Sequence, residues 1–144
     1  MTGEGRPHGV ELGRLHVPVV ASSPKASRDL IGIIGTQWGI TAEAVESAQL
    51  AVSELVTNVG AHAIGMPGST VIISVSRVGT MLSVEVHDSS SKAPILRSAG
   101  EYSESGRGLL LVAGVTDAYG HYFTPTGKVV WFEIKTHWPS GVSV

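Results

Sequence analysis

The most regular hydrophobic pattern in the chain lies between residues 42 and 63. Apolar side chains recur there at steps of three or four, at Val45, Ala48, Val52, Leu55, Val56 and Val59. This spacing forms one apolar stripe along an α-helix. Thr41 is a candidate N-cap, and Glu43 and Glu46 lie in the early turns, where acidic side chains favour the positive end of a helix. The pattern predicts a long helix over Ala42–Ala63.

A different period follows this helix. Apolar and polar residues alternate over Thr70–Arg77 and Met81–Asp88, on either side of a turn that contains Gly79. Alternation of this kind is typical of half-buried strands. The side chains expected to face the core are Val71, Ile73, Val75, Leu82, Val84 and Val86. A second hairpin is predicted over Gly120–Phe123 and Lys128–Thr136.

The remaining segments complete the predicted order. Leu12–Val20 has the composition of a strand, which Pro18 would confine to a sheet edge or end early. Ser23-Pro24 predicts the start of a helix that reaches about Gly35. No pattern is found from Ser89 to Arg107, a length typical of a functional or disordered loop, and Leu109–Val115 reads as a short apolar helix.

This order predicts one α/β (α+β) two-layer sandwich. We expect the domain to cover residues 12–137, with flexible tails at 1–11 and 138–144. The chain has 144 residues, of which 42% are hydrophobic and 15% charged, so it can bury a single core without disulfides.

Composition also excludes several functions. A net charge of −2 argues against nucleic acid as a partner. The absence of cysteine excludes disulfides, thiolate zinc sites and a cysteine nucleophile. No stretch approaches the roughly 20 apolar residues that span a bilayer, and the N-terminus lacks the features of a secretory signal. The expectation is a cytoplasmic protein that does not bind membranes.

Three polar residues on the long helix form a row. Glu54, Asn58 and His62 are spaced i, i+4, i+8 and are expected largely opposite the apolar stripe. Such a row can be a solvent-exposed face. It can also be a site, because a carboxamide oxygen suits a hard cation and a carboxylate can act as a ligand or a base. Two details weaken the first interpretation: Leu50 and Ala51 flank the same face, so it is not uniformly polar, and an asparagine in mid-helix lowers the helix propensity.

Two further features can carry chemistry. Asp88 ends an alternating strand, where it is either a turn aspartate or a carboxylate that accepts a hydrogen bond from a ligand amine. Gly106-Arg107-Gly108 precedes the short apolar helix, so a phosphate could reach free N–H groups there, with charge from Arg107 or Lys92. The segment from Gly120 to Lys128 is not a Walker A loop, since Val129 replaces the required Ser or Thr.

In this order the segments resemble the GHKL ATPases. Glu54-Leu55-Val56-Thr57-Asn58 is similar to their N box, Asp88 with Pro94 to their first glycine box, and Gly106-Arg107-Gly108-Leu109 to their second. Within that superfamily the chain is most similar to the RsbW/SpoIIAB-type anti-sigma-factor kinases, especially the actinobacterial ones. Gly127-Lys128-Val129-Val130-Trp131 fits the same group.

The resemblance implies a Bergerat, or histidine-kinase-like ATPase, fold, with a mixed and mostly antiparallel sheet and helices on one face. It implies that Asn58 binds Mg²⁺ and that Glu54 is the general base. Asp88 would accept from the adenine amino group of ATP. Ser89–Ser105, including Lys92, would form a lid, and the Gly106, Arg107, Gly108 and Leu109 turn would meet the phosphates.

The implied activity is that of a serine/threonine protein kinase. Its implied substrate is a small STAS-type anti-sigma-factor antagonist, with a sigma factor as a second partner and a homodimer as the assembly. One departure from the family pattern keeps an alternative open. Ser89-Ser90-Ser91 stands where a glycine usually follows the aspartate, which favours a non-catalytic ATP- or ADP-binding module. A detached sensor-kinase domain is the third interpretation.

Overall fold

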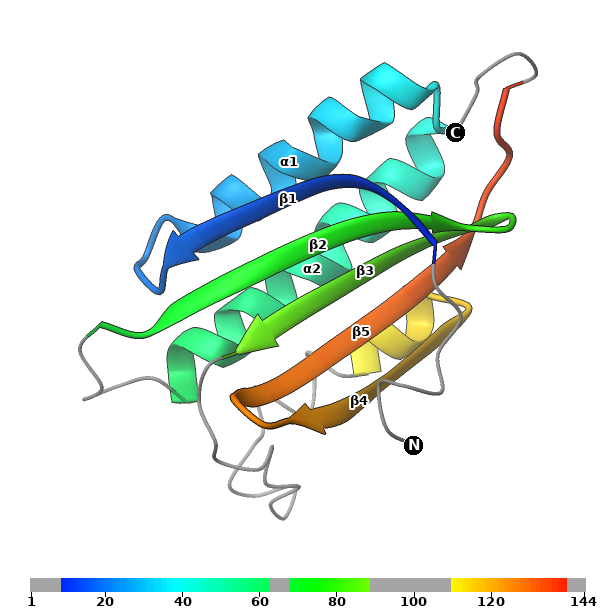
Figure 1. Cartoon of the computed structure of the whole chain (residues 1–144). Coiled ribbons are helices and arrows are strands. Elements are labelled where there is room, and N and C mark those ends of the chain that lie inside the picture. Colours follow the sequence, from blue (N-terminus) through cyan, green and yellow to red (C-terminus); the bar gives the residue numbers. More distant parts are fainter. Residues whose placement is uncertain (1–8, 63–67, 89–109, 140–144) are drawn as a thin grey trace.

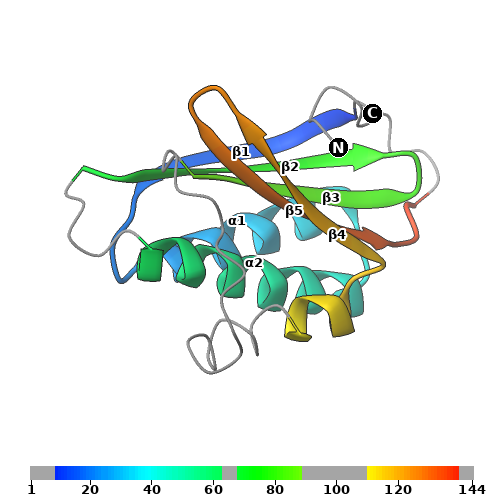
Figure 2. The ribbon, with the colours of Figure 1, turned by 90° about the horizontal axis from the view of Figure 1, so that it is seen from below.

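One antiparallel sheet organises the molecule. The computed structural model describes residues 9–62, 68–88 and 110–139. Its elements are β1 (Val10–Pro18), α1 (Ser23–Trp38), α2 (Ala42–His62), β2 (Thr70–Val78), β3 (Met81–Asp88), β4 (Ala118–Thr124) and β5 (Gly127–Lys135). Residues 110–115 form a short helix before β4. The five strands are ordered β1-β2-β3-β5-β4, and each neighbouring pair is antiparallel. Both long helices cover one face of the sheet (Figures 1 and 2).

The core lies between the sheet and α2. All six side chains predicted to face inward from β2 and β3 are buried, as is the stripe on α2 from Ala48 to Val59. β5 adds Phe132, which lies opposite Val84 in the strand register. From α1, Ile31 and Ile34 close the core. Because each element buries its apolar face against another layer, the predicted two-layer sandwich is confirmed.

Several predicted starts and ends of helices and strands are confirmed. Thr41 caps α2, since the Ala44 N–H donates to Thr41 Oγ1 at 3.3 Å. β1 lies at the sheet edge and ends at Pro18, as the proline requires. Within the described residues, no helix combines the length and the apolar character needed to cross a membrane.

Three boundaries differ from the prediction, and two of them involve a contact with a distant segment. β1 begins at Val10, inside the expected tail, because its backbone pairs with β2 at Arg77. The helix α1 continues past Gly35 to Trp38 and ends at Gly39, which has a φ of 65°. Trp138, also in an expected tail, is only 8% exposed. Its indole N–H donates to the Thr80 carbonyl oxygen at 3.1 Å, and Arg77 stacks on its ring.

Gly35 allows α1 and α2 to approach closely, and its replacement is a test of the packing. A Cβ at this position would clash with Val45 Cγ2. Gly35→Ala is therefore expected to lower the free energy of unfolding by about 1–3 kcal/mol, although alanine favours helices. Urea denaturation would measure the change.

Gly114 supplies the control for this variant. It lies in the short helix, and a Cβ there would meet no atom within 4 Å. Gly114→Ala is expected to be neutral or to stabilise the protein by up to about 1 kcal/mol. If both alanine variants stabilise the protein, the close helix approach at Gly35 is wrong.

Candidate functional site

Two elements that carry predicted site residues finish at the same end of the sandwich. The helix α2 packs against β3 and β5, and its C-terminal end lies beside the C-terminal end of β3 in both ribbon views (Figures 1 and 2). Glu54 and Asn58 belong to the C-terminal half of α2, and Asp88 is the last residue of β3. A helix and a sheet hold these groups more firmly than loops would.

Glu54 and Asn58 lie at the edge of the buried stripe of α2. Both are half-buried, so the expectation that they lie largely opposite the stripe is wrong in degree. Helical spacing explains it, because Ala51 is fully buried and lies next to both of them on the helix surface. Neither residue therefore belongs to a fully solvated face.

The direction of this row follows from its neighbours on α2. One flank of the helix faces α1, because Ser53 and Gln49 make hydrogen bonds to the guanidinium and the carbonyl of Arg28. Ser47 is on the other flank and lines a depression of about 310 Å³ with Val115. Since positions i and i+7 share a helix face, Glu54 lies on the flank of Ser47. It is directed away from α1, toward the side where the 110–115 helix lies (Figure 2).

Asp88 is buried on the face of the sheet that the helices cover. It follows Val84 and Val86 in the alternation of β3, and the residue directly opposite it on β5 is Lys128. Lys128 Nζ lies 3.8 Å from Asp88 Oδ2, and both side chains are 3% exposed. Burial lowers the pKa of the Lys128 amine, although the adjacent Asp88 carboxylate opposes this shift. Asp88 is therefore a buried residue at the end of a strand, and its side chain is not exposed at the surface.

The burial of Lys128 beside Asp88 was not predicted from the sequence. Lys128 is in phase with Val130, Phe132 and Ile134 along β5, so its side chain is on the face of the strand that faces the core. A charged residue in phase with buried apolar ones is rarely fully buried without a partner. That mismatch was visible in the sequence, but its partner was not.

Some predicted site residues are outside the part of the chain that the structure describes. Lys92, Gly106, Arg107, Gly108 and Leu109 all fall within residues 89–109, and the side chain of His62 is likewise not described. The short helix expected after the Gly106–Gly108 turn is present at residues 110–115. Among the described residues, no group of three or more His, Asp or Glu side chains is arranged to hold a metal ion.

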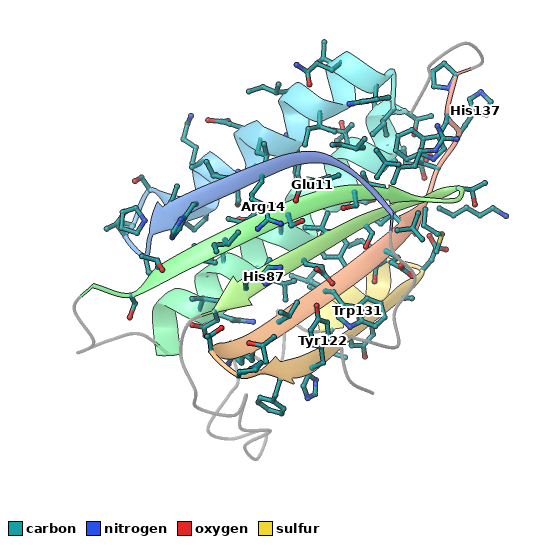
Figure 3. The ribbon with its side chains drawn as sticks, viewed as in Figure 1. Glu11, Arg14, His87, Tyr122, Trp131 and His137 are labelled. Carbon is teal, nitrogen blue, oxygen red and sulfur yellow. The ribbon has the colours of Figure 1, made fainter. Side chains whose placement is uncertain are left out.

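A separate polar cluster covers the sheet face opposite the helices (Figure 3). Tyr122 donates to Glu85 Oε2 at 3.0 Å, and His87 Nε2 lies 3.4 Å from the other oxygen of Glu85. Near β1, a hydrogen bond from Arg14 lowers the pKa of Glu11. These residues alternate with the buried ones along their strands, so the sheet separates them from the candidate site.

Comparison with known proteins places the chain in a family. The sequence matches the histidine kinase-like ATPase domain over residues 21–134. The chain belongs to this family. The histidine kinase-like ATPase domain is also similar in structure to the RsbU and RsbW domains of Rv1364c from Mycobacterium tuberculosis, with a TM-score of 0.64 and 13% identity. The alignment covers 92% of this chain and 35% of that one. No curated protein matches the sequence.

These findings confirm the predicted GHKL, RsbW-like fold of the histidine kinase-like ATPase domain. Membership of an ATPase family implies ATP as the ligand, and the residues of the site suit it. Asp88 is a buried carboxylate, which is a hydrogen-bond acceptor only. Asn58 and Glu54 present oxygen atoms from one face of a helix, as a hard cation requires. The donor set therefore fits a nucleotide with a divalent cation.

Proposed function

We propose that this histidine kinase-like ATPase domain is a cytoplasmic serine/threonine protein kinase of the anti-sigma-factor type. It would phosphorylate a small STAS-type antagonist and regulate transcription by exchanging that antagonist for a sigma factor, and it would act as a homodimer. The observation that carries the proposal is the position of Glu54 and Asn58. They are half-buried on one flank of α2, in the half of the helix that runs toward the end of β3 at Asp88.

Each residue has a role that its position supports. The bound nucleotide would supply the phosphoryl group, and Mg²⁺ would neutralise charge on the phosphates. Asn58 would hold the Mg²⁺ through its amide oxygen. Asp88 would accept a hydrogen bond from the adenine amino group. Arg107 and Lys92 would add positive charge near the phosphates, and the N–H groups that follow Gly106 and Gly108 would bind them.

Glu54 would act as the general base. The attacking group is a serine or threonine hydroxyl of the antagonist, and its proton must leave as the bond to phosphorus forms. A carboxylate one helical turn before Asn58 is held on the same rigid element as the proposed metal ligand. The Glu54 side chain is partly buried, so its carboxylate is less hydrated than on a fully exposed surface. It stays accessible from the flank of the helix. The Glu54 carboxylate would therefore receive this proton, and ADP would be the leaving group.

One observation favours a second candidate, a regulatory module that binds ATP or ADP without transferring phosphate. The carboxylate proposed to bind adenine is already paired with a buried lysine. In addition, Ser89-Ser90-Ser91 follows it instead of glycine. Both features concern the residues proposed to bind adenine, and neither concerns Glu54 directly. ATP binding and phosphate transfer must therefore be measured separately.

The test combines calorimetric titration of ATP with a transfer assay on a purified STAS-type antagonist. Wild-type protein is expected to bind ATP more tightly with Mg²⁺ than with EDTA. Asn58→Ala is expected to lose most of this difference, about 10- to 100-fold in affinity, because a charge-assisted contact of this kind contributes about 1.5–3 kcal/mol.

Thr57→Ala is the matched control, since Thr57 is exposed on the same helix and its hydroxyl donates to the Ser53 carbonyl in its own turn. It is expected to behave like the wild type. Binding without transfer to any STAS-type antagonist would favour the regulatory module. Absence of ATP binding would contradict both candidates.

A further inference from the structure

In the part of the chain that the structure describes, half of the exposed large apolar side chains lie in one stretch. Eight such side chains are exposed, and four of them belong to residues 110–123. They are Leu110, Leu111, Tyr119 and Phe123, and we call them the 110–123 surface. Single apolar residues scattered over a surface are normal, whereas apolar side chains that gather on one side of a molecule mark a site of interaction.

Packing of the core does not account for these side chains. The short helix at residues 110–115 buries Val112 and leaves its two leucines exposed. On β4, Tyr119 lies opposite the fully buried Phe132 of β5, and opposite residues of an antiparallel pair project from the same face. Phe123 likewise lies opposite the buried Lys128. Tyr119 and Phe123 therefore project from the helix-covered face, but β4 is the last strand of the sheet and they stay half exposed.

The 110–123 surface adjoins the flank of α2 that carries Glu54. Ser47 is on this flank, one i to i+7 step before Glu54, and it lines the depression of about 310 Å³ together with Val115 and Asp117. Val115 ends the short helix and Asp117 precedes β4, so the flank and this segment face each other across the depression. Figure 2 shows the short helix beside α2 and β4 following it. A hydroxyl that reaches Glu54 from its accessible flank must therefore approach from this side.

The segment offers apolar contacts and little charge. Between residues 110 and 124, Asp117 is the only Asp, Glu, Lys or Arg. Its Oδ2 accepts a hydrogen bond from the Lys135 backbone N–H at 2.7 Å. The ring of His121 packs edge-on against Phe123, with the centroids 5.9 Å apart. A partner that rests here must therefore contribute apolar side chains, because charge complementarity can contribute little to its binding.

We propose that the 110–123 surface docks the protein substrate by binding an apolar surface next to the serine or threonine that is phosphorylated. This inference rests on the proposed function and extends it to residues that bind the substrate without taking part in the transfer. Leu110 and Phe123 are the anchors on the short helix and on β4. A second copy of the chain on this surface would obstruct the approach to Glu54, which favours the substrate as the occupant.

The test measures binding of the purified STAS-type antagonist by isothermal titration calorimetry, beside the transfer assay. Leu110→Gln and Phe123→Thr are each expected to weaken this binding about 10-fold, because each removes an apolar anchor from the interface. The KM for the antagonist is expected to rise by the same factor, while kcat and the affinity for ATP stay within a few-fold of the wild type. Ile33→Gln is the matched control, since Ile33 is 57% exposed on α1, from which Glu54 is directed away. It is expected to bind the antagonist like the wild type.

Several outcomes would overturn the inference. Normal antagonist binding by both surface variants would do so, and so would an equal loss in Ile33→Gln. A loss of ATP affinity in the surface variants would assign the surface to the nucleotide site instead. A change from dimer to monomer with normal antagonist binding, measured by analytical ultracentrifugation, would assign it to a second copy.

The failure of the proposed function can be recognised separately. A wild type that binds no ATP would overturn that function and this inference with it, and so would one that binds ATP but no antagonist. Normal binding of both ligands, with no effect of either surface substitution, would overturn the inference alone. The two substitutions lie in different elements, so a folding defect in one variant leaves the other to decide.

Discussion

Replacement of Glu54 by glutamine is expected to slow phosphoryl transfer to the antagonist by about 10²- to 10⁴-fold, the usual contribution of a general base. The amide of glutamine has nearly the same shape but cannot accept the hydroxyl proton. The affinity for ATP is expected to stay within a few-fold of the wild type, because the proposed contacts of Glu54 are with the attacking hydroxyl. Single-turnover transfer of labelled phosphate would measure the transfer rate, and calorimetric titration would measure the affinity for ATP. Glu54→Ala is likewise expected to lose transfer and to keep its affinity for ATP.

Glu46 offers a matched control on the same helix. It is exposed in the early turns of α2, far along the helix from Asn58. Glu46→Gln is expected to transfer phosphate at the wild-type rate. If Glu54→Gln also transfers phosphate at that rate, Glu54 is not the base. If it loses ATP affinity and transfer together, Glu54 binds the nucleotide or its metal instead.

The second large effect concerns the core beneath the site. Phe132 is fully buried at the centre of β5, opposite Val84, among the largest side chains of the core. Phe132→Ala is expected to lower the free energy of unfolding by about 3–5 kcal/mol, since it removes apolar contacts and leaves a cavity. Urea denaturation followed by circular dichroism would measure the loss.

Phe123 is the control for this change, because it is 53% exposed on the edge strand β4. Phe123→Ala is expected to cost less than about 1 kcal/mol. Similar losses in the two variants would contradict the assignment of the core to the helix-covered face of the sheet.

Because Phe132 and Lys128 project from the same face of β5, nucleotide binding should weaken along with stability in Phe132→Ala.

Much of the fold could be predicted because the repeat of apolar residues along each helix or strand shows which of its faces is buried. The α2 stripe repeats with the helical turn, and β2 and β3 alternate between the core and the opposite face. The order of these elements, with the motifs around Asn58 and Asp88, was enough to indicate the histidine kinase-like ATPase domain. Two errors have a common cause: Val10 and Trp138 were assigned to tails, and their conformations depend on partners in other elements. The end of α1 was placed too early, at Gly35, although Gly39 supplies a local C-terminal cap.

The candidate site divides in the same way. The polar spacing of Glu54 and Asn58 and the strand-end position of Asp88 are local properties, and they could be read along the chain. The flank to which Glu54 is directed depends on where α1 packs, and the approach of Lys128 to Asp88 depends on the register between β3 and β5. The repeat of apolar residues along a strand indicates that a side chain is buried. It does not identify the residue that faces this side chain on the neighbouring strand. Pairing between strands distant in sequence supplies that partner, and here it places a lysine beside the carboxylate proposed to bind adenine.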